Sequence, residues 1–410
     1  MRFSKILISL TILFFACDDI GKGYEWQSDI PAGFTRKYGS AGYDYGWNAS
    51  YSPFDEGIII VGQKNISIIG GQSDLWAIKT DKRGLVEWEK SFGGNNDDVG
   101  YDVIATSNGG FLFVGHTWSF GNKQQVYAIK TDFHGNIEWE RNYGGYMWDV
   151  GTSVIEVKTG GYVLAGFSNS PGISSGNTDM FMIMIDSNGD EIWKKAHGNS
   201  AYPNHEWAND IIQLADESFI LVGARDRYDK GLKNGLVVKV DKQGDFLWEK
   251  EFIDDDQIEE SFYSISQSID GNFYIAGSIN SSNNQENYNP KLIKMDDFGN
   301  VAWGRVFSGQ SRKYHQSRAI STSSGSIIIV GSSTLGTPLG FKEDAFMIKT
   351  DLKGNIIWNY SYGTSNDDDW GWSVFETPKK NLVFVGSTKS FGASLFDIYL
   401  VGTNADGITQ

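Results

Sequence analysis

The chain has 410 residues, with 51 acidic and 35 basic side chains and a net charge of -16, so we expect no nucleic-acid partner, because phosphate binding needs a basic surface. Apolar residues make up 40% of the chain and charged residues 21%, with 49 glycines and only 7 prolines, which excludes a disordered or proline-rich protein. The single cysteine excludes a disulfide framework, a cysteine-rich zinc site and dithiol redox chemistry.

The first segment is predicted to be a targeting signal. Arg2 and Lys5 precede an apolar run from Ile6 to Ala16, which is shorter than the ~20 residues that a membrane helix requires. Cys17 follows this run directly, and the junction resembles the lipobox of bacterial lipoproteins, whose cysteine is acylated and becomes the mature N-terminus. We predict a lipoprotein signal peptide over residues 1–16 and lipid attachment, such as palmitate, at Cys17. The alternative is an ordinary cleaved signal.

The same resemblance predicts the location of the protein. A lipidated Cys17 would anchor the chain to a membrane, and residues 17–33 would form the lipidated end and a short tether. Asp18 and Asp19 resemble the surface-export signal of some Gram-negative lipoproteins. We expect a cell-envelope protein, lipid-anchored at the outer membrane, and the acidic pair points to the cell surface.

Seven repeats occupy the rest of the chain. One marker is an Asp-x-x-Gly turn followed by a tryptophan, at intervals of 51 to 55 residues: Trp88, Trp139, Trp193, Trp248, Trp303 and Trp358. A second marker is a glycine after a short apolar run, and it occurs seven times: Gly62, Gly115, Gly166, Gly223, Gly277, Gly331 and Gly386. A fixed period of about this length is typical of repeat architectures such as propellers.

Each repeat predicts four short strands. In the second repeat they are GYDVIATS, FLFVGHT, VYAIKTD and NIEWERNYG, separated by turn residues. Four strands in ~50 residues match one blade of a propeller. We therefore predict an all-β fold, a single seven-bladed β-propeller over residues 34–410.

The chain ends predict how the ring closes. The seventh repeat supplies three strands and stops at Gln410, before a fourth strand. At the other end, residues 34–39 align with residues 88–93, which form a predicted fourth strand. We predict that this N-terminal strand completes the last blade, which would remove the exposed sheet edges.

The repeated residues are interpreted as structural. A short acceptor side chain can bond its own backbone at the start of a turn, glycine accepts the left-handed conformation, and tryptophan packs between blades. The turn aspartates are Asp81, Asp132, Asp186, Asp241, Asp296 and Asp351. The pattern resembles the tryptophan-docking repeat of quinoprotein-like propellers and, with a different glycine spacing, the Asp boxes of sialidases. It is similar to a largely uncharacterised group of secreted propellers, some labelled endoglucanase, which implies this fold and a carbohydrate-active hydrolase as one alternative.

Long loops rich in Ser, Asn and Gly follow the second and fourth strands, on what we predict to be the functional face. The position that starts each innermost strand is acidic in six of seven blades: Asp44, Asp98, Asp149, Glu206, Glu260 and Asp369. Aromatic residues accompany it: Tyr43, Tyr45, Trp47, Tyr146, Trp148, Tyr202, Trp207, Tyr263, Trp370 and Trp372. The combination suits a saccharide, a cation such as calcium, or a partner rich in Lys and Arg. Alternatively, each carboxylate ties down its own loop.

We assign ligand binding to these six carboxylates and to Trp148, Trp207, Trp370 and Trp372, which lie outside the repeated tryptophan register. No catalytic residue, metal site or cofactor is predicted, because a ring of acids singles out no pair for hydrolysis and the five histidines lack metal-ligand spacing. The leading function is non-enzymatic binding of a glycan or protein ligand by a monomeric envelope lipoprotein. The alternatives are a carbohydrate-active hydrolase and a scaffold subunit of an envelope complex.

Overall fold

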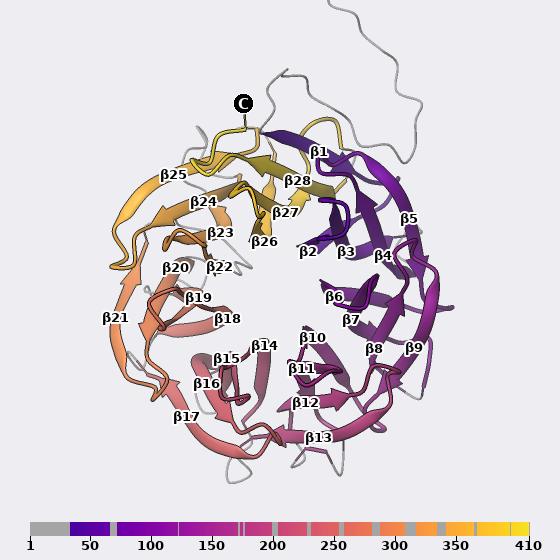
Figure 1. Ribbon diagram of the computed structural model, residues 1–410, viewed down its shortest axis with the longest axis vertical. Helices are drawn as coiled ribbons and strands as arrows, with labels where there is room; N and C mark the ends of the chain where they lie inside the picture. Colours follow the sequence, from indigo (N-terminus) through magenta and orange to yellow (C-terminus); the bar gives the residue numbers. More distant parts are fainter. Residues whose placement is uncertain are drawn as a thin grey trace, which may run out of the picture.

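The protein is the seven-bladed β-propeller that the sequence predicts (Figure 1). The computed structural model describes residues 33–65, 72–121, 123–170, 173–174, 177–198, 204–227, 231–253, 258–280, 288–307, 317–333, 342–364, 367–393 and 395–409. Within these ranges there are strands and turns but no helices, and the strands β1 to β28 form seven antiparallel sheets of four. Cys17 and Tyr202, which the sequence singles out, lie outside the described residues.

Each sheet is a blade, and its four strands lie side by side in order from the central axis to the outside of the ring (Figure 1). The innermost strands are β2 (Tyr45–Tyr51), β6 (Asp98–Ala105), β10 (Asp149–Glu156), β14 (Glu206–Gln213), β18 (Glu259–Gln267), β22 (Arg318–Ser321) and β26 (Asp369–Glu376). The second strands are β3 (Ile58–Asn65), β7 (Phe111–Thr117), β11 (Tyr162–Ser168), β15 (Phe219–Arg227), β19 (Phe273–Asn280), β23 (Ile327–Ser333) and β27 (Leu382–Thr388). The third strands are β4 (Ser73–Thr80), β8 (Gln125–Thr131), β12 (Asp179–Ile185), β16 (Leu232–Val240), β20 (Tyr288–Met295), β24 (Asp344–Thr350) and β28 (Asp397–Thr403). The outer strands are β5 (Val86–Phe92), β9 (Ile137–Tyr143), β13 (Glu191–His197), β17 (Phe246–Phe252), β21 (Val301–Val306), β25 (Ile356–Tyr362) and β1 (Phe34–Tyr38).

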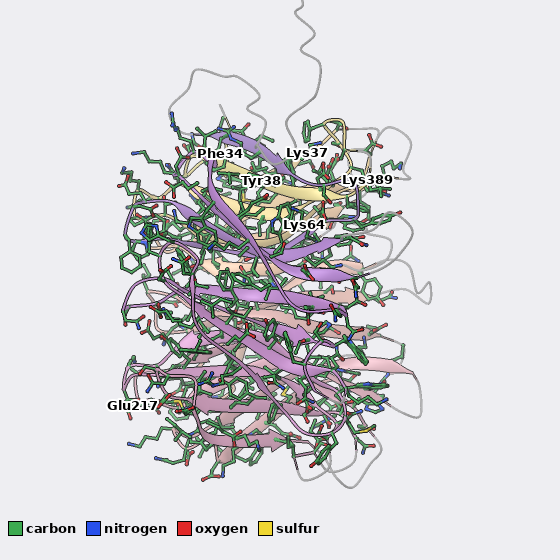
Figure 2. The ribbon with its side chains drawn as sticks, turned by 90° about the vertical axis from the view of Figure 1, so that its right-hand side faces the viewer. Phe34, Lys37, Tyr38, Lys64, Glu217 and Lys389 are labelled. Carbon is green, nitrogen blue, oxygen red and sulfur yellow. The ribbon has the colours of Figure 1, made fainter. Side chains whose placement is uncertain are left out.

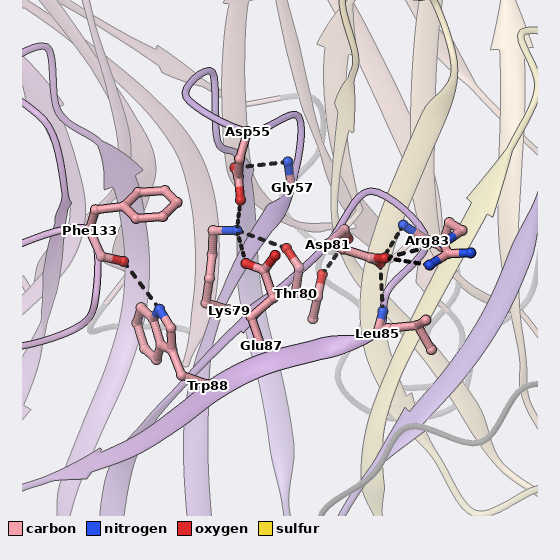
Figure 3. A network of polar contacts seen from close by, with 10 residues as sticks. All are labelled: Asp55, Gly57, Lys79, Thr80, Asp81, Arg83, Leu85, Glu87, Trp88 and Phe133. Carbon is pink, nitrogen blue, oxygen red and sulfur yellow. Dashed lines mark hydrogen bonds and ion pairs between the residues drawn. The ribbon is translucent and has the colours of Figure 1, made fainter.

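A repeated tryptophan contact joins each blade to the next. Trp88 donates its indole N–H to the Phe133 carbonyl oxygen at 3.1 Å, in the turn of the following blade (Figure 3). Gly135 lies in that turn at φ +74°, and a Cβ there would be 2.9 Å from the Trp88 ring, so glycine is required. Trp139 packs against Gly189 in the same way. The predicted packing of the register tryptophans between blades is confirmed.

The turn at residues 81–85, which precedes Trp88 in the chain, is held by hydrogen bonds between its own polar groups (Figure 3). One oxygen of Asp81 accepts the N–H groups of Arg83 at 2.8 Å and Leu85 at 2.9 Å, as the Asp-x-x-Gly pattern predicts. Just before the turn, the buried ammonium of Lys79 bonds to Glu87 at 2.8 Å. A buried charge needs such a partner, so the lysine and the turn stabilise the blade together.

The ring closes through β1. This strand pairs antiparallel with β28, with Phe34 opposite Gly402. Phe34 occupies the tryptophan register, and a Cβ added to Gly84 of the first blade would lie 3.0 Å from its ring. Tyr38 donates its hydroxyl to the Gly84 carbonyl oxygen at 2.6 Å, just as Tyr143 does to the turn of the third blade. The predicted closure by the N-terminal strand is confirmed.

The blades pack face to face, and the two ends of the propeller differ. The apolar side chains of the second and third strands are buried between neighbouring blades, in clusters that each combine two blades. The turns after the first and third strands have five or six residues, whereas the loops after the second and fourth strands vary in length and reach eleven residues. Figure 2 shows Glu217, in a short turn, and Lys389, in a longer loop, on opposite faces. We call these faces the short-turn face and the long-loop face.

Candidate functional site

The six predicted carboxylates are buried, and four of them accept hydrogen bonds from the loops that precede the innermost strands: Asp44, Asp98, Asp149 and Asp369. Each exposes at most 2% of its surface. Asp149 accepts a hydrogen bond from the Gly145 N–H at 2.9 Å and one from the Ser170 hydroxyl at 2.8 Å, and Asp369 accepts one from Ser390 at 2.6 Å. In these four blades the position therefore fixes loop geometry, and none of the six carboxylates lines the cavity at the centre of the propeller.

Two of these carboxylates are ion-paired inside their own blades. Glu206 accepts a bond from the Arg225 Nε at 2.8 Å, and Arg225 also pairs with two glutamates of the outer strand. Glu260 pairs with Lys291 at 2.8 Å. Such buried charges are retained only with a partner, so the pairs are part of the blade structure. Ligand contact by the six carboxylates stays a prediction, and their contacts give it no support.

The pKa values of two neighbouring acids are raised beside Trp370. Burial raises the pKa of Asp369 to about 6, although its hydroxyl donors act in the opposite direction. Burial, together with the charge of Asp369, raises the pKa of Asp344 to about 6. A raised pKa means that each acid holds its proton at a higher pH than an exposed carboxyl group does.

Seven aromatic rings from blades 7, 1 and 2 form one continuous cluster, which we call the aromatic arc: Tyr43, Tyr45, Trp47, Tyr101, Trp370, Trp372 and Phe396. The centroids of Trp370 and Phe396 are 4.2 Å apart, and the rings of Tyr45 and Trp370 lie within 7° of parallel at 6.5 Å. The Trp47 ring is 5.1 Å from Trp372 and 5.9 Å from Tyr101. The arc therefore links the two ends of the chain across the closed ring.

A bulge in the innermost strands places three of these rings side by side. The register of β2 shifts between Gly46 and Asn48, so Trp47 is the bulged residue. Tyr101 in β6 and Trp372 in β26 occupy the same bulge. A bulge leaves its extra residue outside the ladder and re-aims the side chain. The sequence analysis missed Tyr101 and Phe396. Tyr101 could have been found by comparing, across the seven repeats, the residue that follows the glycine of each innermost strand.

The arc has an accessible end and a buried end. Tyr43 exposes 40% of its surface, Tyr45 and Trp370 are half-buried, and Trp372 exposes only 6%. The indole N–H of Trp370 donates to Glu343 at 3.1 Å, so its polar edge is already engaged. The ring faces near Tyr43 are thus the surfaces that a ligand could contact.

The other two predicted tryptophans lie apart from the arc. Trp148 exposes 48% of its surface in the loop between blades 2 and 3. Trp207 is half-buried, with the Lys233 ammonium 5.3 Å from its ring. No ring contact joins either side chain to the arc among the described residues. The structure therefore brings together Trp370 and Trp372 but not Trp148 and Trp207.

Below the arc, the innermost strands of all seven blades enclose a central cavity of about 240 Å³. Seven of its lining residues, one from each blade, form a set that we call the central ring: Asn48, Asp102, Ser153, Asp210, Ser264, Arg318 and Ser373. Six of them directly follow the bulged residue of their strand, whereas Arg318 begins β22, whose pairing with β23 shows no bulge. Each innermost strand runs from the long-loop face toward the short-turn face, so the central ring lies deeper than Tyr45 and Trp47.

The acids of the central ring bond to neighbouring blades. Asp102 accepts the N–H of Val154 in the next blade at 2.8 Å, and Asp210 accepts that of Ile265 at 2.9 Å. Burial raises the pKa of Asp102 to about 6. Arg318 is the single cation of the ring, and it makes no hydrogen bond or ion pair with any residue that the structure describes.

The described ranges contain neither a candidate metal-ligand group nor a candidate membrane-spanning helix. No group of three or more His, Cys, Asp or Glu side chains is placed to hold a metal ion there. Likewise, the described part of the chain contains no helix with the length and hydropathy of a membrane span.

Comparisons with known proteins support the fold. No protein-family model matches the chain, and no curated protein matches it. Among solved structures, an ulvan lyase, a polysaccharide lyase bound to -[GlcA(1-4)Rha3S]-, aligns with a TM-score of 0.59 at 10% identity, covering 90% of this chain and 96% of that one. A protein of unknown function from Dyadobacter fermentans gives 0.52 at 11% identity, with 91% and 99% covered. An α-L-arabinofuranosidase from Fusarium graminearum, in complex with an iminosugar inhibitor, gives 0.50 at 10% identity, with 75% and 93% covered. At these identities the likeness shows the propeller fold alone.

Proposed function

We propose that the protein binds a saccharide along the aromatic arc, at the long-loop end of the central cavity. The single observation that carries this proposal is the continuity of the arc, which runs from the exposed Tyr43 to Trp47, the residue before Asn48 of the cavity wall. The apolar face of a sugar ring stacks on aromatic faces, while its hydroxyls need polar partners nearby. Asn48 and the serines of the central ring supply such partners.

The structural neighbours are consistent with a carbohydrate ligand. The ulvan lyase and the arabinofuranosidase both act on carbohydrates, and both are propellers of similar extent. Because fold alone does not determine function, the arc carries the proposal and the neighbours only add context.

A glycan array followed by calorimetry tests the proposal. Trp370→Ala removes a half-buried ring from the centre of the arc, so it should weaken binding of the best array hit by about 1 to 3 kcal/mol. Tyr146→Ala is the matched control, because Tyr146 is an aromatic residue that does not belong to the arc and exposes 74% of its surface. Equal affinities for wild type and Trp370→Ala, or loss of binding in Tyr146→Ala alone, would place the ligand elsewhere.

A carbohydrate-active hydrolase is the second candidate. The observation that favours it is the pair of acids next to Trp370, because a general acid must keep its proton near neutral pH and the pKa of Asp344 is about 6. Release of reducing sugar from the bound glycan would support this activity, provided that Asp344→Asn abolishes it while binding persists.

We further propose that the propeller acts at the cell envelope, anchored through lipid at Cys17. The support is the sequence pattern alone, an apolar segment followed by the only cysteine. Cys17→Ser should therefore move the protein from the membrane fraction to the soluble fraction and abolish labelling with a fatty-acid analogue. An unchanged fractionation would refute the anchor.

A further inference from the structure

Arg318 differs from the other six residues of the central ring because its side chain is a cation that cannot accept a hydrogen bond. Asp102, Asp210 and Ser264 each accept an N–H group of the following blade, as Ser264 accepts that of Ala319 at 2.7 Å. Ser153 and Ser373 instead donate their hydroxyls to Asp210 and Asn48, the next members of the ring. A guanidinium cannot accept a hydrogen bond, so Arg318 makes no such link, and it lines the cavity together with the other six members of the ring. The charges of Asp102 and Asp210 act on Arg318 across the cavity, but neither lies within ion-pair distance of it.

We infer that Arg318 binds the carboxylate of an acidic saccharide whose ring stacks on the aromatic arc. This inference rests on the proposed function and names the class of saccharide. The planar guanidinium presents five donors, a geometry that matches a carboxylate with two parallel hydrogen bonds. Because the described residues leave all of these donors without a hydrogen-bond acceptor, a ligand can take them without breaking an existing bond.

The two acids of the central ring do not occupy this position. Asp102 accepts bonds from Val103 and Val154, both at 2.8 Å, and Asp210 accepts bonds from Ile211 and Ile265, both at 2.9 Å. Their oxygens are thus held toward the strands by backbone donors. A ligand carboxylate in contact with Arg318 would be closer to that cation than either aspartate is.

The size of the cavity fits the same ligand, and a second cation lies at the arc. A cavity of about 240 Å³ has the volume of roughly eight waters, which suits one sugar residue. The ammonium of Lys389 lies 4.3 Å from the Phe396 ring at the arc. This ammonium is also 3.6 Å from a carboxylate oxygen of Asp368, so a saccharide stacked there would meet a lysine that already has a partner.

Part of the acidity behind the overall charge of -16 is remote from the arc. The six turn aspartates, from Asp81 to Asp351, follow the third strands and lie at the short-turn face. An innermost strand of eight residues such as β6 is about 26 Å long at ~3.3 Å per residue, whereas the Debye length at physiological salt is about 8 Å. Salt therefore screens these charges from the arc.

Saturation-transfer difference NMR tests the inference with matched probes. The probes are D-glucuronate, D-galacturonate and D-mannuronate, each compared with the corresponding neutral hexose at constant ionic strength. At least one uronate should bind about tenfold more tightly than its hexose, as expected for a charge-assisted bidentate contact. Arg318→Met should reduce uronate binding to the level of the hexose, and Arg318→Lys should retain part of the preference.

Arg305→Met is the control, because Arg305 is exposed on the outer strand β21 and should leave the preference unchanged. Melting curves confirm that each variant is folded. The inference is overturned if no uronate is preferred over its hexose, or if a folded Arg318→Met keeps the preference. A uniform affinity for acidic and neutral sugars that Trp370→Ala abolishes would overturn the inference and leave the proposed function standing.

Discussion

At the scale of single residues, the tryptophans divide into two groups with different roles. Those in the repeat register, such as Trp88 and Trp139, pack on a glycine of the next blade and donate to a turn carbonyl. Those outside it either join the arc, as Trp370 does, or stand in loops, as Trp148 does. The same side chain thus stabilises blades in one place and presents a ring face in another.

This division predicts opposite effects of the same substitution. Trp139→Ala removes an inter-blade contact and should lower the free energy of unfolding by about 3 kcal/mol. Trp148→Ala, at a side chain that is 48% exposed, should change it by no more than about 0.5 kcal/mol. Chemical denaturation of both variants measures the difference. Similar losses of stability in the two variants would contradict the distinction between register and loop tryptophans.

The acids near Trp370 predict a pH dependence of stability. The pKa of Asp344 is raised to about 6 by burial and by Asp369, so the folded state binds the proton more tightly than the unfolded state does. The stability that this group contributes is present below its unfolded pKa, about 4, and is lost as the pH rises through 6. Asp344→Asn should therefore raise the melting temperature relative to wild type at pH 7.5 and by less at pH 5. A constant difference across that range would show that the carboxyl group of Asp344 does not titrate as described.

At the scale of elements, β1 serves as the outer strand of a blade formed otherwise by the C-terminal strands. Its pairing with β28 and the contacts of Phe34 and Tyr38 with Gly84 join blade 7 to blade 1. Without it, β28 would be left as an exposed edge, and the surface of the first blade that Phe34 covers would be open to water.

Removing β1 should therefore open the ring. A variant without residues 34–38 should lose roughly 4 kcal/mol or more, because the buried Tyr38 ring goes with the strand pairing. Tyr38→Phe deletes only the hydroxyl bond to Gly84 and should cost about 1 kcal/mol. Thermal melting of both variants tests the order of these effects, and a truncated chain that melts like the wild type would show that β1 does not close the ring.

The sequence predicted elements better than it predicted the site. The repeat period, the alternation of apolar and polar residues in the strands and the place of Phe34 in the tryptophan register all reflect contacts that recur in every blade. Because the chain repeats these contacts seven times, its sequence contains several copies of each pattern. The start of an innermost strand also repeats, but the pattern does not say whether Asp149 points to solvent or to Ser170, and it is buried. The arc depends on Tyr45 meeting Trp370, two residues that only closure brings together.

At the scale of the whole molecule, closure creates both the stability and the candidate site. The arc crosses the junction between blades 7 and 1, and the central cavity exists because seven innermost strands surround it. The acidic turns lie at the short-turn face, and the aromatic rings approach the long-loop face. The arc lies at the long-loop end of the propeller, so we expect the saccharide there.

A crystal structure of the protein with the saccharide that binds best on the array is the most direct test of this account. We predict density for a sugar ring stacked against Tyr45 and Trp370, with its polar groups directed toward the central ring. Density at the short-turn face or on the outer strands, or an aromatic arc left empty by a saccharide that binds in solution, would contradict the proposed site.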